Sequence, residues 1–252
     1  MSFRVGADEY DRFMGRYSRR LAPAFVEFVG IADGWRVLDV GCGSGALTSQ
    51  LAGRLDPQKV WAVDPQEAFV SAVRDRHPGV RAQRASAEAL PFEDQLFDAA
   101  LAQLVVHFMA DPVAGLREMG RVVRPGGVVA ACVWDHAGRM GPLSGFWETA
   151  RALDPGVEDE SRLAGTRDGQ LAELLAMAGL HHHRSAGLTV RVEHASFEEW
   201  WEPFELGVGP AGAYVSRLGA SRRARLREAC RARLPAGGFT ISATAWAAMA
   251  RV

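Results

Sequence analysis

The sequence predicts an α/β fold: a doubly wound, mostly parallel sheet with helices on both faces. Short apolar runs alternate with amphipathic segments between residues 35 and 134. Strands that alternate with helices need crossover connections, which make neighbouring strands parallel and cover both faces of the sheet. The chain has 252 residues, of which 48% are hydrophobic, so it can bury a sizeable core. We therefore expect residues 1–252 to form a single domain.

The elements of the first half follow one another in regular order. Strands are assigned to short runs of β-branched and apolar residues, and helices to segments whose apolar residues share one face. In the first of these helices, for example, Leu47, Leu51 and Leu55 lie on one side. The strands are expected at 35–41, 59–64, 80–86, 97–103 and 126–134, and the helices at 46–55, 65–77 and 112–123.

The second half of the chain is less regular. Residues 135–169 mix glycine, proline and charged residues around a short amphipathic piece, which is typical of an inserted cap. The elements expected after this cap are a helix at 169–180, a strand near 187–196, a helix opening at 196–204, an arginine-rich helix at 221–234 and a last strand at 237–252.

Charge and hydropathy exclude several classes of partner. The formal net charge is −1 and the pI is about 6.7, so no overall field attracts nucleic acid or an anionic membrane. The arginine-rich helix at 221–234 lacks interleaved aromatic residues, which favours a solvated helical face over an RNA or phosphate site. No segment approaches the roughly 20 apolar residues of a membrane span, and the N-terminus lacks the apolar core of a signal peptide.

The cysteines indicate a reducing compartment. Cys42, Cys132 and Cys230 are odd in number, widely spaced and without a CxxC pair. This pattern argues against a disulfide framework and against a cysteine zinc site. We therefore expect a cytoplasmic protein, and the sequence carries no signal for its oligomeric state.

A glycine loop follows the first predicted strand, in the segment VLDVGCGSGAL at 37–47. It satisfies the dinucleotide pattern GxGxxG/A through Gly41, Gly43 and Ala46, and the pattern GxGxG as well. Glycine lets the backbone approach a ligand closely, and Asp64 at the end of the next strand can accept hydrogen bonds from both ribose hydroxyls. By itself the loop leaves open a nicotinamide dinucleotide, another nucleoside cofactor, or a tight turn that only packs against a helix.

Four further segments follow the loop in order: AVDP at 62–65, SAEALPFEDQLFD at 86–98, HFMADP at 107–112 and VRPGG at 123–127. With the loop, they resemble the class I S-adenosylmethionine-dependent methyltransferases, in the small-molecule branch similar to ubiquinone and menaquinone biosynthesis methyltransferases. The resemblance implies a Rossmann-like methyltransferase fold of seven strands, with the last strand antiparallel and inserted. It also implies S-adenosylmethionine as cofactor and S-adenosylhomocysteine as product.

The resemblance further assigns cofactor contacts to the strand ends. It places Gly41, Cys42 and Gly43 of the glycine loop under the methionine and ribose, and Asp64, followed by Pro65, at the ribose hydroxyls. After the third strand, it places Ser86, Ala87 and Glu88 beside the adenine. At the end of the fourth strand, it places Gln103 and Leu104 beside the amine and methyl group.

Two of the matched positions need comment. Asp39, just before the glycines, either acts through a water molecule or orders the loop. Ser86 departs from the family pattern, since many relatives carry aspartate there. Its hydroxyl can still accept a hydrogen bond from the adenine amino group, more weakly than a charged oxygen.

Residues 1–30 are expected to form a helical lid. The segment YDRFMGRYSRR resembles a cofactor-closing helix of some family members, which implies that Tyr10, Met14, Arg16 and Ser18 lie near the methionyl carboxylate. An arginine fork there would form a charge-assisted pair. The alternative is a solvated amphipathic helix.

His107, which follows the fourth strand, is the candidate catalytic residue. Transfer of a methyl group from a sulfonium to an acceptor is an in-line displacement, which needs alignment and exclusion of water above all. A base is required only where the acceptor loses a proton, and histidine titrates near neutrality. Packing, or capping of the next helix, is the alternative role for His107.

The remaining aromatic residues predict either an apolar acceptor pocket or part of the core. They are Trp134, Phe146, Trp147, Trp200, Trp201, Phe204 and Tyr214. Trp134 and Trp147 are assigned nearer the pocket. The histidine run at 181–183 is not expected to bind a metal, because in extended backbone only two of the three share a face and no acidic partner is near.

The predicted function is transfer of a methyl group from S-adenosylmethionine to a small organic acceptor that is apolar or aromatic in part. One alternative is a catalytically inactive module that binds S-adenosylmethionine or S-adenosylhomocysteine. A less favoured alternative is an NAD-dependent oxidoreductase, which would need a tyrosine–lysine or similar pair although Lys59 is the only lysine.

Overall fold

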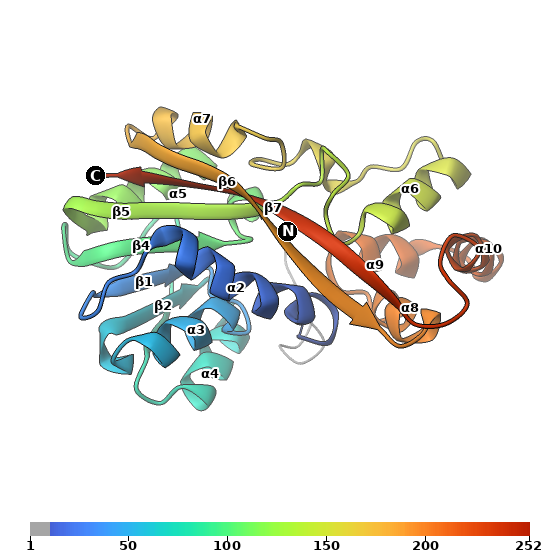
Figure 1. Ribbon diagram of the computed structural model, residues 1–252, viewed down its shortest axis with the longest axis horizontal. Coiled ribbons are helices and arrows are strands. Elements are labelled where there is room, and N and C mark those ends of the chain that lie inside the picture. Colours follow the sequence, from blue (N-terminus) through green and yellow to red (C-terminus); the bar gives the residue numbers. More distant parts are fainter. Residues whose placement is uncertain (1–10) are drawn as a thin grey trace.

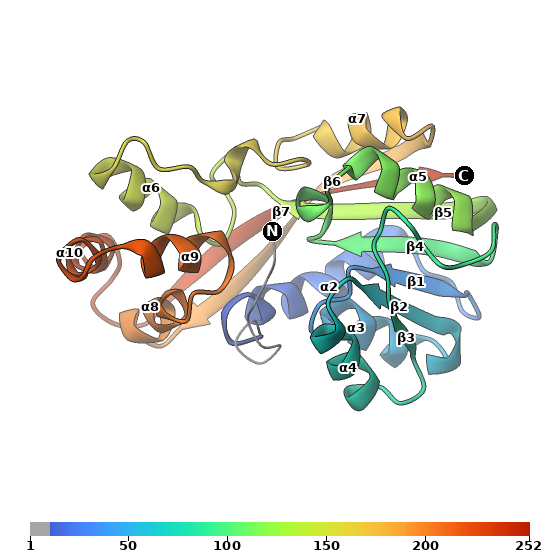
Figure 2. The same cartoon turned by 180° about the vertical axis from the view of Figure 1, so that it is seen from behind.

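The computed structural model of the protein describes residues 11–252, apart from the side chains of Arg12, His182 and His183. Seven strands form one sheet (Figures 1 and 2). The pairs among β1 to β5 are parallel, and β7 runs antiparallel between β5 and β6. The predicted doubly wound fold with an inserted antiparallel last strand is confirmed. The strand order is β3 (Arg81–Arg84), β2 (Val60–Asp64), β1 (Val37–Val40), β4 (Phe97–Gln103), β5 (Val123–Trp134), β7 (Phe239–Arg251), β6 (His181–His194).

Successive residues of the central strands face opposite sides of the sheet, which gives two apolar layers. In β1, Val37 belongs to one layer and Leu38 to the other, and both are fully buried. The first layer is covered by α2 (Arg16–Val29), α3 (Ala46–Arg54) and α4 (Glu67–Arg76), and the second by α5 (Pro112–Val122) and α7 (Gln170–Met177).

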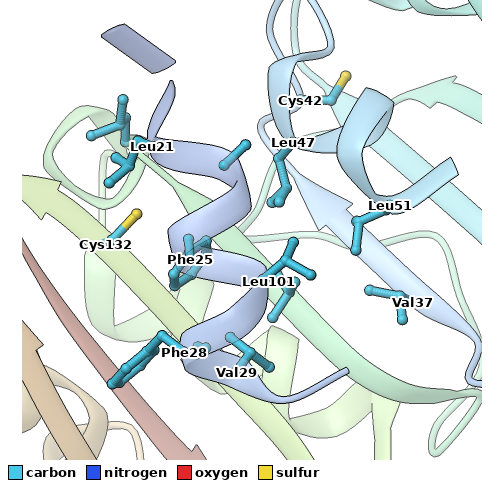
Figure 3. Packing of buried hydrophobic residues seen from close by; sticks show 14 of the residues in the cluster. Leu21, Phe25, Phe28, Val29, Val37, Cys42, Leu47, Leu51, Leu101 and Cys132 are labelled. Atoms are coloured by element: carbon cyan, nitrogen blue, oxygen red, sulfur yellow. The ribbon is translucent and has the colours of Figure 1, made fainter. Parts of the chain in front are cut away.

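Helix α2 anchors the N-terminal lid to the sheet. Figure 3 shows Phe25 and Val29 of this helix near Leu101 of β4, and Leu21 belongs to the same cluster. Leu21 and Phe25 are fully buried, so this face supplies the apolar contacts that a marginal isolated helix needs. The helix ends at Gly30, whose φ of +73° suits a left-handed C-cap.

Strands β6 and β7 extend beyond the parallel strands and carry a helical cap (Figure 1). They pair antiparallel from His181 opposite Arg251 to His194 opposite Phe239. The predicted cap at 135–169 contains only the first cap helix, whereas the other three follow β6, so the cap joins two separate stretches of the chain. The cap helices are α6 (Ser144–Leu153), α8 (Phe197–Glu205), α9 (Gly209–Arg217) and α10 (Ala220–Arg231).

The cap has an aromatic core of its own. The rings of Phe146 and Phe204 stack with centroids 4.5 Å apart and planes inclined by 11°. Trp201 is only 1% exposed and packs beside both rings. Trp147 and Trp200 belong to the same cluster. Of the seven aromatic residues that the sequence assigns to a pocket or the core, all but Trp134 therefore belong to the cap cluster.

The arginine-rich segment forms α10, as its composition predicts. Its buried positions are Leu226 and Cys230. The guanidinium of Arg231 lies 4.4 Å from the centre of the Phe197 ring and pairs with Glu198. The helix is thus attached to the cap through a few apolar positions and through Arg227 and Arg231, and it presents Arg222 and Arg225 to solvent.

Predicted and observed boundaries differ most at β6. This strand begins at His181, whereas local alternation places its start near residue 187. The early part of the strand is held by pairing with β7, including Gly187 opposite Trp246. Long-range pairing, which local alternation does not reveal, therefore extends the strand.

None of the three cysteines forms a disulfide among the described residues. Cys42, Cys132 and Cys230 are free and buried, and burial raises the pKa of each thiol, so each stays protonated near neutral pH. Within residues 11–252, no helix combines the length and the apolar character needed to cross a bilayer. In the same part of the chain, no three histidine, cysteine or acidic side chains are grouped so that they could hold a metal ion.

Candidate functional site

A cavity of about 280 Å³ lies at the carboxyl ends of β1, β2 and β4. In a doubly wound sheet, ligands bind at this edge, where the strand order reverses. The reversal falls between β1 and β4, because the chain runs from β1 outward to β3 and then returns to β4. The predicted cofactor residues that line the cavity are Ser18, Asp39, Gly41, Cys42, Gly43, Asp64, Pro65, Ser86, Ala87, Glu88, Gln103 and Leu104.

The glycine loop needs glycine for two different reasons. Gly41 has a φ of +72°, and a Cβ there would lie 2.4 Å from a methyl carbon of Val105. Gly43 has a φ of +50°, and a Cβ there would meet no atom within 4 Å. The first glycine therefore permits close packing under the loop, and the second leaves the cavity wall open to a ligand.

Asp64 holds the loop and the end of β2 together. Its Oδ2 accepts a hydrogen bond from the N–H of Gly43 at 3.0 Å, and its Oδ1 accepts one from the N–H of Gln66 at 2.9 Å. Burial raises the pKa of this carboxyl, while the two backbone donors lower it. A carboxylate oxygen can accept more than one hydrogen bond, so Asp64 can still receive a pair of ribose hydroxyls.

Asp39 lies in the floor of the cavity. Its side chain accepts a hydrogen bond from Thr48 Oγ1 at 2.6 Å, at the start of α3. Burial, with the charge of Asp64 adding to it, raises the pKa of Asp39 to about 7, although the bond from Thr48 opposes the shift. This contact supports the interpretation that Asp39 orders the loop.

Ser86 and Glu88 form the wall after β3. The Ser86 hydroxyl donates to the Glu88 carboxylate, which also accepts from the N–H of Ala110 at 2.9 Å. Burial alone would raise the pKa of Glu88, but these hydrogen bonds outweigh it and lower the pKa. Glu88 therefore ties the loop after β3 to the loop after β4.

The sequence analysis missed several apolar lining residues. Phe69, Val105, Phe108 and Met109 line the same cavity and give it faces on which a planar base can pack. Phe108 and Met109 lie inside the segment HFMADP, so the motif contained a signal for them. Phe69 is brought in by α4 and had no comparable signal.

Gln103 and Leu104 end β4 at the innermost part of the cavity. Gln103 Nε2 donates to the carbonyl of Ser18 in α2 at 3.1 Å, whereas the buried Oε1 has no hydrogen-bond partner. Leu104 has a φ of +62°, an unusual conformation for a non-glycine residue, and its N–H donates to the carbonyl of Cys132 at 2.8 Å. This conformation, held by β5, turns the chain sharply where the cavity ends.

A second, smaller chamber adjoins the cavity at Leu104 and Phe108, which line both. Its volume is about 30 Å³. The lid, the sheet and the cap all contribute to its wall, so we name it the acceptor chamber. Its other lining residues are Phe13, Met14, His107, Trp134, His136, Leu143, Glu160, Val208, Gly209 and Pro210.

His107 lies in the wall of the acceptor chamber. It is 7% exposed, its ring centroid is 3.9 Å from that of Phe108, and its Nδ1 has no hydrogen-bond partner. Burial, with His136 adding to it, lowers the pKa of His107 well below its usual value. The imidazole is therefore neutral at physiological pH. It packs against Phe108 and also lines the chamber.

The predicted lid residues are divided between several places. Tyr10 lies outside the described residues. Met14 lines the acceptor chamber rather than the cofactor cavity. Arg16 lines neither, because it hydrogen-bonds His194 Nδ1 at 2.9 Å and pairs with Glu199.

Asp11 is a lid contact that the sequence analysis missed. It accepts hydrogen bonds from Ser44 Oγ in the glycine loop and from Arg76 Nη1 at 3.1 Å, and it pairs with Arg19 at 3.1 Å. Ser44 and Arg76 lie 33 and 65 residues away in the chain, so no local pattern pointed to these contacts. Asp11 ties the lid to the loop that borders the cavity.

Comparison with known proteins identifies a methyltransferase domain in the first half of the chain. Residues 38–131 match the family model described as "Methyltransferase domain". The chain is 28% identical over 211 residues to malonyl-[acyl-carrier protein] O-methyltransferase of Erwinia pyrifoliae, covering 73% of this chain and 78% of that protein. Residues 38–131 therefore form a methyltransferase domain. Its methyl donor is S-adenosylmethionine, and its activity is methyl transfer.

Two further comparisons define the limits of this assignment. An uncharacterized methyltransferase of Mycobacterium tuberculosis is 35% identical over 136 residues, covering 54% of this chain and 52% of that protein. The chain thus spans about half the length of this relative. The [4+2]-cyclase SpnF has a similar fold, with a TM-score of 0.58 and 21% identity over 92% of this chain and 80% of that chain. This similarity concerns the fold alone.

The residues of the cavity fit S-adenosylmethionine. The unpartnered buried Oε1 of Gln103 can accept from the methionyl ammonium, and the open space at Gly43 admits a ligand against bare backbone. Asp64 would hold the ribose hydroxyls of this methyltransferase's cofactor, and Ser86 stands in the wall where the resemblance places the adenine.

Proposed function

We propose that this methyltransferase transfers the methyl group to a small organic acceptor bound in the acceptor chamber. The observation that carries the proposal is the junction of two cavities of different character at Leu104 and Phe108. One cavity presents carboxylates and bare backbone, and the other is walled mainly by apolar side chains. The motif blocks similar to the ubiquinone and menaquinone branch support the same class of acceptor.

Bound S-adenosylmethionine would supply an activated methyl group, whose carbon an acceptor atom attacks in line while S-adenosylhomocysteine leaves. The chain's own residues must therefore align the acceptor and exclude water. Leu104 lies at the boundary of the two cavities, and β5 holds its backbone through the bond to Cys132. Phe13 and Trp134, 4% and 2% exposed, close the chamber from the lid and the sheet.

His107 contributes to this proposal chiefly by position. A general base works best when its pKa is near the working pH. Burial lowers the pKa of His107 well below neutrality, which makes it a weak base in the free protein. We therefore propose that alignment supplies most of the acceleration, and that His107 receives a proton only from acceptors that lose one readily.

The test measures binding and transfer separately. Calorimetric titration of the protein with S-adenosylmethionine, S-adenosylhomocysteine and NAD is expected to show binding of the first two only. Release of S-adenosylhomocysteine is then followed by mass spectrometry with a panel of small apolar acceptors. Donor binding without release for any acceptor would indicate the inactive module, and binding of NAD alone would indicate the oxidoreductase.

A variant that fills the acceptor chamber sharpens the test. Met14→Trp adds bulk to the chamber wall and is expected to abolish transfer while S-adenosylhomocysteine affinity stays within about threefold. Met177→Trp is the matched control, because Met177 is 66% exposed on α7 and lines neither cavity. Equal loss of cofactor binding and transfer in Met14→Trp would contradict the assignment of the two cavities.

A further inference from the structure

The described wall of the acceptor chamber carries one formal charge, and it is negative. Its titratable lining residues are His107, His136 and Glu160, and no lysine or arginine belongs to the described wall. Burial lowers the pKa of both histidines, so each is neutral near pH 7. Glu160 is therefore the only formal charge that the described wall presents.

Glu160 is a buried carboxylate with few hydrogen-bond or ion-pair partners. It comes from the short turn after α6, is 5% exposed, and accepts a hydrogen bond from Trp147 Nε1 at 3.0 Å. Among residues 11–252, no ion-pair partner of Glu160 is found. The nearby carboxyl of Asp135, 4% exposed, accepts from the N–H of Gly138 at 2.7 Å and adds a second acidic group beside His136.

Three nitrogen atoms of lining residues also have no hydrogen-bond partner: Nδ1 of His107, Nε2 of His136 and Nε1 of Trp134. Each of these side chains is at least nine-tenths buried. Buried polar atoms are nearly always paired in folded proteins, and unpaired ones cost free energy. Their concentration around one small chamber indicates a place where a polar ligand completes the hydrogen bonds.

The electrostatics of the wall restrict what that ligand can be. A carboxylate with one hydrogen bond gains most from a ligand N–H or O–H, above all from a cationic one. A carboxylate or phosphate group brought beside Glu160 would meet a like charge in a poorly solvated space, with no lysine or arginine in the described wall to offset it.

We propose that the acceptor chamber selects acceptors that carry an N–H or O–H donor and no negative charge, and that Glu160 determines this selectivity. The inference rests on the proposed function, because it assigns the acceptor to this chamber. The inference goes beyond the proposed function by naming the chemical class of the acceptor and a residue of the cap that distinguishes one class from another.

The size of the chamber adds a structural requirement. About 30 Å³ holds on the order of two water molecules, so an organic acceptor enters only as the walls separate. One wall residue, Val208, lies between Gly207 and Gly209, whose φ values are +75° and +65°. Glycine tolerates such conformations without strain, which places two permissive backbone positions in the cap wall.

The test compares three probes of similar shape: benzylamine, benzyl alcohol and benzoate. Their binding is measured by calorimetry on the protein saturated with S-adenosylhomocysteine. For the wild type we expect benzylamine to bind at least about tenfold more tightly than benzoate, with benzyl alcohol between them. Glu160→Gln keeps the shape and an acceptor for Trp147 but removes the charge.

Glu160→Gln is expected to weaken benzylamine binding about tenfold, change benzyl alcohol binding less than about threefold, and strengthen benzoate binding. Glu158→Gln, at an exposed position two residues away, is the matched control and should leave all three affinities unchanged. Retained S-adenosylhomocysteine binding shows that each variant is folded.

The outcomes separate the two proposals. Equal affinities of wild type for benzoate and benzylamine, an unchanged ratio in Glu160→Gln, or no binding of either donor probe would overturn the selectivity while leaving the cofactor assignment intact. Failure of wild type to bind S-adenosylhomocysteine would instead overturn the proposed function itself.

Discussion

The cofactor cavity and the acceptor chamber share two wall residues but are assembled in different ways. The cavity is lined mainly by short segments that leave β1, β2, β3 and β4 at one edge of the sheet. The chamber takes its wall from the lid, from the ends of β4 and β5, from the turn after α6 and from the start of α9. Its residues therefore span positions 13 to 210 of the chain.

This difference indicates which part of the molecule can change to alter specificity for the acceptor. Strand ends of a parallel sheet are held by the main core, so their loops keep a set geometry for the cofactor. The chamber depends on the docking of a cap that has its own aromatic cluster. Changes in the cap should alter the acceptor without altering the donor, and changes in the strand-end loops should do the reverse.

The largest effect is expected from Phe204→Ala in the cap core. Phe204 is fully buried and stacks on Phe146, so its truncation should cost about 3–5 kcal/mol of unfolding free energy. Denaturant unfolding measures this loss, and calorimetry should show S-adenosylhomocysteine affinity within about threefold of wild type. A parallel loss of cofactor affinity would show that the two regions are not separable. Met177→Ala, at a position 66% exposed, is the control.

Asp39 in the cofactor cavity and the two histidines of the acceptor chamber should change stability in opposite directions as pH rises. The pKa of Asp39 is raised to about 7 in the folded protein, so its contribution to stability is complete below its unfolded value and is lost as pH rises through 7. The pKa values of His107 and His136 are lowered, so their contribution is present above the unfolded value and lost as pH falls.

Asp39→Asn isolates the first of these contributions. Relative to the variant, the wild type should lose up to about 4 kcal/mol of unfolding free energy as pH rises from about 4 to about 8, because each tenfold difference in proton affinity between the folded and unfolded states is worth about 1.4 kcal/mol. Urea unfolding of both proteins at several pH values measures the difference. A difference that does not depend on pH would mean that Asp39 is ionised throughout.

Asp64→Ala should weaken S-adenosylhomocysteine binding about a hundredfold. The substitution removes the acceptor for the ribose hydroxyls and releases the N–H of Gly43, which together are worth about 3 kcal/mol. Calorimetry measures the affinity. Asp75→Ala, at an exposed position on α4, should bind as the wild type does, and an equal loss there would point to a general charge effect.

The smallest losses of stability are expected at two glycines, Gly30 and Gly41, which have similar φ values but different surroundings. Gly30→Ala places a side chain at a φ of +73° in open space, and should cost about 1 kcal/mol of stability. Gly41→Ala has a similar φ of +72° but also meets Val105 at 2.4 Å, and should cost about 2 kcal/mol or more and loosen the cofactor loop. Thermal unfolding of both variants measures the costs; equal values would mean that Val105 moves aside freely.

Most of the predicted cofactor residues line one cavity, because they lie in local motifs at strand ends. Gly41, Gly43 and Asp64 are recognisable from their spacing and from the strands that precede them. Arg16 was predicted near the methionyl carboxylate, yet His194 and Glu199 bind it from 178 and 183 residues away. Glu160 gave no signal, since a single acidic residue in a loop resembles any solvated charge.

The sequence by itself determined the α/β class, the cofactor edge of the sheet and the glycine loop, because hydrophobic period and turn chemistry act over a few residues. The tertiary structure alone decided that two separate stretches form one cap. It also decided that Met14 turns to the acceptor chamber and that Glu160 is buried there beside Trp147. Burial and pairing of a side chain depend on which distant segments pack around it, and no local pattern carries that information.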